Sequence, residues 1–250
     1  MDFVQLSIND GVAEARLKRG KVNAINEQVV HELSDSLQRL AADPEIRAVI
    51  LTGDGPFFSF GFDIPEFLSY SEESFSSFLK NFTSLYTYLF TYPKPVVAAL
   101  NGHAIAGGCM LALACDYRIM VSGKAKISLN EITFGSSVFA GSVIMLKFLV
   151  GAKNAQAGLY EGTMYSAEAA LHVGLIDQVS SNEKLLEDAR QTARRLGARD
   201  AAAFRSMKNL LRAPVAEQMI KEEDSSVREF VKIWYSANTW KHLQAITIHS

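Results

Sequence analysis

The chain has 250 residues, 48% of them hydrophobic and 21% charged, with a formal net charge of −2. These values are ordinary for a globular protein and leave room for one mid-sized domain, or one domain with a small appendage. The near-neutral charge argues against a broad nucleic-acid surface, so an anionic ligand would be bound by local groups. Apolar stretches are interrupted before the roughly 18 residues that a membrane span needs, so no membrane partner is expected.

Cysteine usage and the N-terminus bear on the compartment. Cys109 and Cys115 lie six residues apart in one apolar segment and would point to different faces of a helix, so we expect two buried free thiols and no disulfide. No Cys/His set has the spacing of a zinc site, and no metal is expected. The N-terminal residues lack a signal-peptide pattern. We expect a reducing compartment, with the cytoplasm as the default.

The first half of the sequence predicts alternating strands and helices. Alternating apolar residues around Asn9-Asp10-Gly11 predict a β-hairpin over residues 4–17. Helical spacing predicts a helix from Asn26, a plausible N-cap, to Ala42. Short apolar runs predict buried strands over residues 47–52, 96–100 and 116–121. Further patterns predict two more helices, over residues 72–91 and 109–115.

The C-terminal part has a different character. From about Asn182 nearly every segment is helical by pattern and rich in Ala, Leu, Lys, Arg and Glu. Pro214 is predicted at a helix start, a position that tolerates proline. We place a soft boundary near residue 190, between a sheet-containing core over residues 1–190 and a helical region over residues 191–250.

Three motifs carry the chemistry of the sequence. They are Phe58-Ser59-Phe60-Gly61-Phe62-Asp63-Ile64, Asn101-Gly102-His103-Ala104-Ile105-Ala106-Gly107-Gly108-Cys109-Met110, and Leu129-Asn130-Glu131. Glycine allows a backbone to approach a ligand closely, and a Gly-Gly step at a helix N-terminus leaves free N–H groups at the positive end of the dipole. Such groups can bind an anion or a carbonyl oxygen that becomes negative during a reaction.

In this order the motifs resemble the crotonase superfamily, also called the enoyl-CoA hydratase/isomerase family. The resemblance covers nearly the whole chain, from the Val22-Asn23-Ala24-Ile25-Asn26 loop, through Pro93-Lys94-Pro95-Val96-Val97-Ala98-Ala99-Leu100-Asn101-Gly102 and Ala114-Cys115-Asp116-Tyr117-Arg118, to Ala170-Leu171-His172-Val173-Gly174-Leu175-Ile176-Asp177. It implies an α/β fold with a core of repeated ββα turns, a C-terminal helical region that trimerises or caps, and homotrimers or hexamers.

The resemblance also implies a site. The peptide N–H groups of Phe62 and Gly107 would hold a thioester oxygen and stabilise an enolate. Ala24 and residues Phe60, Gly61, Asp63 and Ile64 would line the groove for an acyl-CoA, and Met110 is also predicted to bind the substrate. Coenzyme A would enter as part of the substrate, and no separate cofactor is expected.

The reaction is indicated by a departure from the hydratase pattern. Hydratases of the family carry two glutamates, and the corresponding positions here hold Met110 and Glu131. Hydration benefits from two positioned carboxylates, whereas moving a double bond needs one proton carrier. The short sequence motifs around these positions resemble those of Δ3,Δ2-enoyl-CoA isomerases of the mitochondrial type. We therefore predict isomerisation of 3-enoyl-CoA to the 2-trans form, with Glu131 as the single acid/base, its pKa raised by an apolar pocket.

Other assignments stay open on the sequence alone. The family also contains hydratases, decarboxylases and thioester hydrolases, and a crotonase-like scaffold or RNA-binding homologue would keep only the fold. Glu131 could be a surface carboxylate at a strand end. We expect a structural role for His103 and loop-orienting bonds for Asp63. The phenylalanines of the first motif could wall an acyl pocket or simply pack. Lys18, Arg19 and Lys21 could contact CoA phosphates or form a solvated charge run, and the second is the default.

Overall fold

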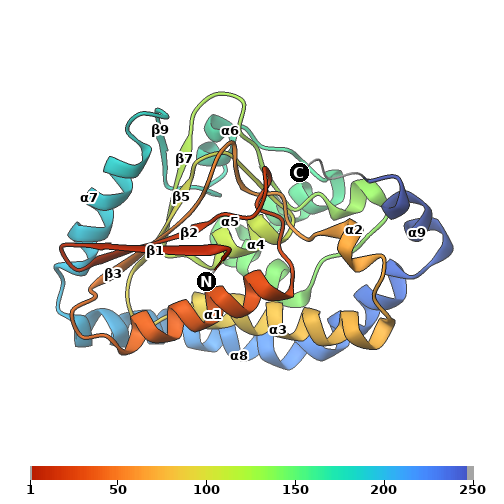
Figure 1. Ribbon diagram of the computed structural model, residues 1–250, viewed down its shortest axis with the longest axis horizontal. Helices are drawn as coiled ribbons and strands as arrows, with labels where there is room; N and C mark the ends of the chain where they lie inside the picture. Colours follow the sequence, from red (N-terminus) through yellow and green to blue (C-terminus); the bar gives the residue numbers. More distant parts are fainter. Residues whose placement is uncertain (1, 247–250) are drawn as a thin grey trace.

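The computed structural model describes residues 2–246, which form two sheets surrounded by helices (Figure 1). The larger sheet has the order β1-β2-β3-β5-β7-β9, in which only the β1–β2 pair is antiparallel. Its central strands are buried along their whole length, as expected for parallel strands covered on both faces. The strands are β1 (Val4–Asn9), β2 (Val12–Leu17), β3 (Ala48–Gly53), β5 (Val96–Leu100), β7 (Tyr117–Val121) and β9 (Gln178–Ser180).

The smaller sheet is what positions the motifs. Its three short parallel strands are β4 (Phe57–Ser59), β6 (His103–Ile105) and β8 (Ile127–Ser128), in the order β4-β6-β8. Three successive turns of the chain, β3–β4, β5–β6 and β7–β8, thus each give one strand to each sheet. Because carboxyl ends of parallel strands meet at one edge, the segments that follow β4, β6 and β8 lie side by side.

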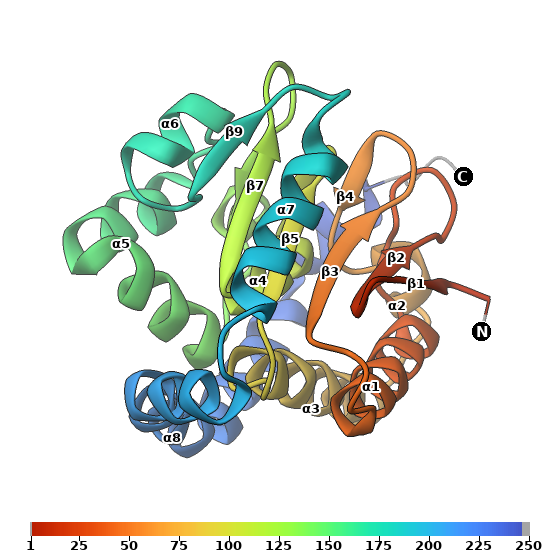
Figure 2. The same ribbon diagram turned by 90° about the vertical axis from the view of Figure 1, so that its left-hand side faces the viewer.

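Helices cover the sheets on several sides. In both ribbon views α1 (Glu27–Ala42), α3 (Glu72–Phe90) and α8 (Ala201–Trp234) run next to one another, and α7 (Leu185–Gly197) lies over the larger sheet (Figures 1 and 2). The remaining helical segments are α2 (Ile64–Phe67), α4 (Gly107–Ala114), η1 (Glu131–Phe134), α5 (Ala140–Glu161), α6 (Ala167–His172) and α9 (Ala237–Gln244). Within residues 2–246, no helix combines the length and apolar character needed to cross a bilayer.

Most of the predicted elements are confirmed. Asp10 and Gly11 have positive φ in the hairpin turn, and the Asn26 side chain caps α1 by accepting from the Val29 N–H. Cys109 and Cys115 are free and buried, as expected. The prediction for Pro214 is wrong: it lies inside α8, which runs unbroken from Ala201 to Trp234. The division near residue 190 stays a prediction, and that residue lies within α7.

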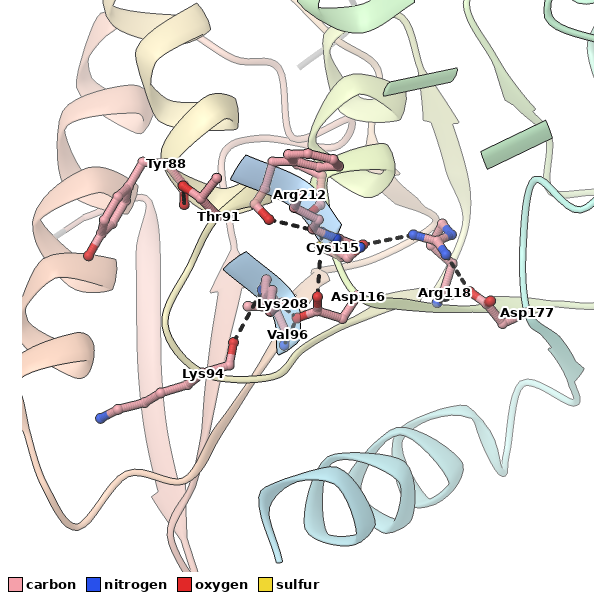
Figure 3. A network of polar contacts seen from close by, with 12 residues as sticks. Tyr88, Thr91, Lys94, Val96, Cys115, Asp116, Arg118, Asp177, Lys208 and Arg212 are labelled. Carbon is pink, nitrogen blue, oxygen red and sulfur yellow. Dashed lines mark hydrogen bonds and ion pairs between the residues drawn. The ribbon is translucent and has the colours of Figure 1, made fainter. Parts of the chain in front are cut away.

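Buried ionic contacts fix α8 to the core (Figure 3). Lys208 Nζ donates to Asp116 Oδ2 over 2.7 Å, and the Val96 N–H donates to the same oxygen over 2.8 Å. The Arg212 guanidinium lies 3.4 Å from Asp116 Oδ1. The exposed fractions of the Lys208, Arg212 and Asp116 side chains are 4%, 6% and 13%. One largely buried carboxylate therefore pairs with two buried cations, an arrangement that depends on each partner being present.

Arg212 also closes the C-terminus of α4. Its guanidinium donates to the carbonyl oxygens of Ala114 and Cys115 over 2.9 and 3.0 Å. A cation at this end satisfies helix carbonyls that lack intrahelical partners and complements the dipole. Since Gly107 is the first residue of α4, the α8 contacts hold the far end of the helix that carries the second glycine motif.

Candidate active site

Gly61 and Gly107 bring the first two motifs into contact. A Cβ atom on Gly61, whose φ is +96°, would lie 2.9 Å from the carbonyl oxygen of Ile105 and 3.1 Å from the nitrogen of Gly107. Only glycine fits this position without displacing the neighbouring backbone. Ala106, just before Gly107, has a φ of 50° despite its side chain, a conformation that L-residues rarely adopt. The backbone is therefore held in an unusual path where the motifs meet.

Two peptide N–H groups are unpaired at this junction. Within residues 2–246, neither the N–H of Phe62 nor that of Gly107 donates to a protein acceptor. Three nearby N–H groups are engaged: Ile25 N–H donates to Gly61 O over 2.7 Å, Asp63 N–H to Ile25 O over 3.0 Å, and Ala106 N–H to Ser128 O over 2.9 Å. Free N–H groups on a backbone pinned from both sides are available to an external oxygen.

A small apolar cavity of about 130 Å³ opens beside these groups. We call it the Glu131 cavity, after the only ionisable side chain that lines it in the described part of the chain. Its lining residues come from all three motifs and from the segments that follow them: Phe60, Phe62, Ile64, Ile105, Ala106, Gly107, Met110, Asn130, Glu131, Phe134, Ser136, Phe139, Phe230, Trp234 and Ile246. It is smaller than the roughly 300–1,000 Å³ of typical ligand pockets.

Glu131 is a buried carboxyl group with a free oxygen. The residue is 4% exposed, and its Oε2 has no hydrogen-bond partner among the described residues. Burial raises the pKa of Glu131 to about 8 because the charged form loses its hydration. It lies at the start of η1, and only Leu129 and Asn130 separate it from the strand β8. The smaller sheet therefore places Glu131 beside the segments that carry the glycine motifs. The predicted direction of the pKa shift is confirmed.

The sequence-predicted residues divide into two groups. Phe60, Phe62, Ile64, Gly107, Met110 and Glu131 all line the Glu131 cavity. Ala24, Gly61 and Asp63 do not. Ala24 is buried, and its carbonyl oxygen accepts from Arg19 over 3.2 Å. Asp63 caps α2 by accepting from the Glu66 N–H and pairs with Arg19 at 2.6 Å, so Arg19 is a partly buried ion-pair partner, not a solvated charge.

Several cavity residues were missed by sequence reasoning. Phe230 and Trp234 reach the cavity from α8, about 100 residues beyond Glu131. Their i, i+4 spacing is common to any amphipathic helix and says nothing about which cavity they enter. Phe139 and Ser136 lie in the segment after η1, which none of the three motifs and none of the predicted elements covers. His103 does not line the cavity; its ring packs at a tilt against Phe57, with the centroids 5.0 Å apart.

The arrangement defines a class of site. A thioester carbonyl whose oxygen takes the two free N–H groups would lie next to a buried carboxyl group and an apolar pocket. Such a site can remove a proton next to the carbonyl and hold the resulting negative oxygen. The repeated turns thus bring together a proton carrier and two free N–H groups, which is the arrangement of a candidate acid/base site with a binding position for a carbonyl oxygen.

Comparison with known proteins assigns the family. The family model for enoyl-CoA hydratase/isomerase matches residues 7–245. The chain is 33% identical over 222 residues to "Enoyl-CoA delta isomerase 1, mitochondrial" of Mus musculus, covering 88% of this chain and 77% of the relative. It is also 33% identical over 231 residues to "Enoyl-CoA hydratase, mitochondrial" of Pongo abelii, covering 91% and 77%.

A solved structure agrees with this assignment. The crystal structure of human mitochondrial delta3-delta2-enoyl-CoA isomerase superposes with a TM-score of 0.91 at 31% identity, covering 97% of this chain and 95% of that one. The chain therefore belongs to the enoyl-CoA hydratase/isomerase family and has the crotonase fold with its helical C-terminal region, as the sequence motifs predicted.

Proposed function

We propose that this protein is a Δ3,Δ2-enoyl-CoA isomerase that moves the double bond of a 3-enoyl-CoA to the 2-trans position. The observation that carries the proposal is which side chains of the Glu131 cavity can exchange a proton. Within residues 2–246, Glu131 is its only lining side chain that can exchange a proton at neutral pH. By the family resemblance, Met110 takes the position of the first of the two hydratase glutamates. One proton carrier is enough for a 1,3-proton shift, whereas hydration benefits from two.

The proposed reaction uses each of the site groups once. The Glu131 carboxylate removes a proton from C2, and the electron pair moves through the C1–C2 bond to the thioester oxygen, giving a dienolate. The N–H groups of Phe62 and Gly107 donate to that oxygen. Glu131 then returns the proton to C4 as the C2–C3 double bond forms and the carbonyl is restored. The overall change conserves all atoms and needs no oxidant, reductant or cofactor beyond the CoA of the substrate.

The surroundings of Glu131 support this task. A carboxyl group with a pKa of about 8 binds a proton strongly enough to take one from carbon and releases it readily enough to return it near neutrality. The apolar lining excludes water that would otherwise compete for the dienolate. Ala24, Gly61 and Asp63 lie outside the cavity, and we assign them to the groove and loop that hold the CoA portion.

We further propose a homotrimer or hexamer as the working form. The side chains of Met207, Leu210 and Leu211 on α8 are 69%, 79% and 61% exposed. With exposed Pro214 they form one apolar face of the helix at positions i, i+3, i+4 and i+7. A contiguous apolar face on a single chain is typical of a protein interface.

The proposed compartment remains the cytoplasm, although the mouse and orangutan relatives are named as mitochondrial.

A substrate panel tests the proposed reaction. One preparation would be assayed with cis- and trans-3-enoyl-CoA for isomerisation, 2-trans-enoyl-CoA for hydration, 2-carboxyacyl-CoA for decarboxylation and saturated acyl-CoA for hydrolysis. We expect the highest kcat/KM for isomerisation. A higher kcat/KM for any of the other three reactions would assign that reaction instead. No turnover, with no rise of Tm on adding acyl-CoA, would favour a scaffold that keeps only the fold.

A further inference from the structure

The residues that line the Glu131 cavity carry more unpaired polar atoms than the proposed reaction uses. Four buried atoms on its lining residues have no hydrogen-bond partner among the described residues: Asn130 Oδ1, Glu131 Oε2, Ser136 Oγ and Trp234 Nε1. Glu131 Oε2 is free for the transferred proton. The other three have no part in the proton shift, yet Ser136 and Trp234 are only 8% and 1% exposed.

An unsubstituted hydrocarbon chain would leave these atoms unpaired. A buried donor without an acceptor is unfavourable, and buried polar atoms in native proteins nearly always have a partner. A site built around such donors discriminates strongly against ligands that lack the matching group. The Trp234 indole N–H can only donate, and the Ser136 hydroxyl can donate, so the matching group is an oxygen that accepts.

We propose that the acyl group taken by this cavity is short and carries a neutral oxygen, a hydroxyl or an oxo group, beyond C4, and that Ser136 and Trp234 donate hydrogen bonds to it. The proposal rests on the proposed function insofar as it takes the Glu131 cavity as the acyl site. Among the described residues no cation lines the cavity, and Glu131 supplies a carboxyl group, so a second carboxylate on the substrate is disfavoured.

Both donors are held in place by their surroundings. The Ser136 N–H donates to the Glu131 carbonyl oxygen over 3.0 Å, which closes the turn after η1 and fixes the serine next to the acid/base. The Trp234 ring lies 4.7 Å from the Phe75 ring and 5.7 Å from the Phe230 ring, measured between centroids. Fixed donors recognise a ligand oxygen with little loss of side-chain entropy on binding.

The size of the cavity sets the length of the acyl group. At about 130 Å³ it accommodates a short chain and lacks room for a long one. Phe134, Phe139 and Phe230 are among its lining residues. The Phe139 and Phe230 rings lie 4.5 Å apart between centroids, which makes this part of the lining densely packed.

Equilibrium binding of saturated acyl-CoAs tests the proposal without depending on turnover. Calorimetric Kd values would be compared for hexanoyl-CoA, 5-hydroxyhexanoyl-CoA, 6-hydroxyhexanoyl-CoA and 5-oxohexanoyl-CoA. We expect at least one oxygenated chain to bind about tenfold more tightly than hexanoyl-CoA. Equal or weaker binding of all three oxygenated chains would overturn the proposal, as would failure of every chain to bind more tightly than CoA itself.

Two variants and two matched controls assign the effect to the named atoms. Ser136→Ala and Trp234→Phe remove the two donors, and we expect each to bring the preference for the oxygenated chain to within about threefold of unity. Ser137→Ala and Trp240→Phe change the neighbouring serine and the other tryptophan, neither of which lines the cavity. We expect them to leave the preference unchanged. An unchanged preference in Ser136→Ala, a small substitution that should not disturb folding, would overturn the role of the serine.

A kinetic arm separates this proposal from the proposed function. 3-Hexenoyl-CoA and its 6-hydroxy analogue would be assayed for isomerisation with the wild type and Ser136→Ala. Preferential binding of oxygenated chains without isomerisation would sink the isomerase assignment and leave this inference intact. If Ser136→Ala lowered kcat equally for both substrates and left the binding preference intact, Ser136 would position Glu131, and substrate recognition by its hydroxyl would be contradicted.

Discussion

Gly61 and Gly107 lie so close that a methyl group on the first would fall 3.1 Å from the amide nitrogen of the second. Position 61 therefore requires glycine for two reasons: a side chain would collide with the backbone at Gly107, and the residue has a positive φ. This contact joins the segments after β4 and β6, and it fixes the spacing of the Phe62 and Gly107 N–H groups. The geometry of the proposed oxyanion hole depends on the absence of a side chain there.

Gly61→Ala should therefore impair catalysis. The added methyl group would push the two N–H groups apart, and losing one such donor lowers rates by about 100-fold or more. We expect a drop of about that size in kcat/KM for 3-enoyl-CoA. Gly123→Ala is a matched control, because Gly123 has a φ of +100° and nothing within 4 Å of its Cβ position. Equal losses in the two variants would show that backbone strain alone is responsible.

The pH dependence of kcat/KM should report the titration of Glu131. In the proposed mechanism the carboxylate is the active form in the first step, and burial raises the pKa of Glu131 to about 8. We expect kcat/KM to rise about tenfold per pH unit below that value and to level off above it. The pKa of Glu223 is also raised by burial, to about 7, so Glu223→Gln should keep the inflection near 8. A flat profile from pH 6 to 9 would contradict the assigned base.

Glu131 should also make the fold less stable as the pH rises. Its folded-state pKa of about 8 lies above the ordinary value of 4.5, so the folded protein holds a proton that the unfolded chain has released. Stability contributed by this group is present below about pH 4.5 and is lost up to about pH 8. We expect the gain in unfolding free energy from Glu131→Gln to be on the order of 4 kcal/mol greater at pH 9 than at pH 5. Urea titrations at both pH values measure it.

The carboxylate that anchors α8 should be essential for stability. Asp116→Ala would leave Lys208 and Arg212 buried without their counter-ion, a change that costs about 3–5 kcal/mol. Asp177→Ala is the control, since Asp177 pairs with a single cation, Arg118, and its side chain is 33% exposed. Denaturant unfolding should show a clearly smaller loss for it. Similar losses in both variants would contradict the central role given to Asp116.

Local patterns were enough to predict much of the fold. The hairpin follows from alternation around Asn9-Asp10-Gly11, and α1 follows from its apolar spacing and the Asn26 cap. The strands β4, β6 and β8 are two or three residues long, too short for any periodicity to reveal. These strands nevertheless align the three motifs. The sequence could therefore indicate that the motifs form one site only through the family resemblance.

Long-range packing decided what the patterns could not. Pro214 is accommodated within α8 because contacts on both sides hold that helix, including Arg212 bound to the carbonyl oxygens of Phe90 and Ala114. Tertiary packing of this kind outweighs the local preference of proline for a helix start. In the same way, nothing in the sequence near Trp234 indicates that this residue lines the Glu131 cavity.

The most direct test of the central claim compares 3-enoyl-CoA isomerisation by the wild type and by Glu131→Gln. Glutamine keeps the size of the side chain and removes the proton carrier, so folding and acyl-CoA binding should persist. We predict that kcat falls by about 10³-fold, within the range for loss of a general acid–base group, while Kd for a saturated acyl-CoA changes little. Undiminished isomerisation by a folded Glu131→Gln variant would contradict the claim that Glu131 carries the proton.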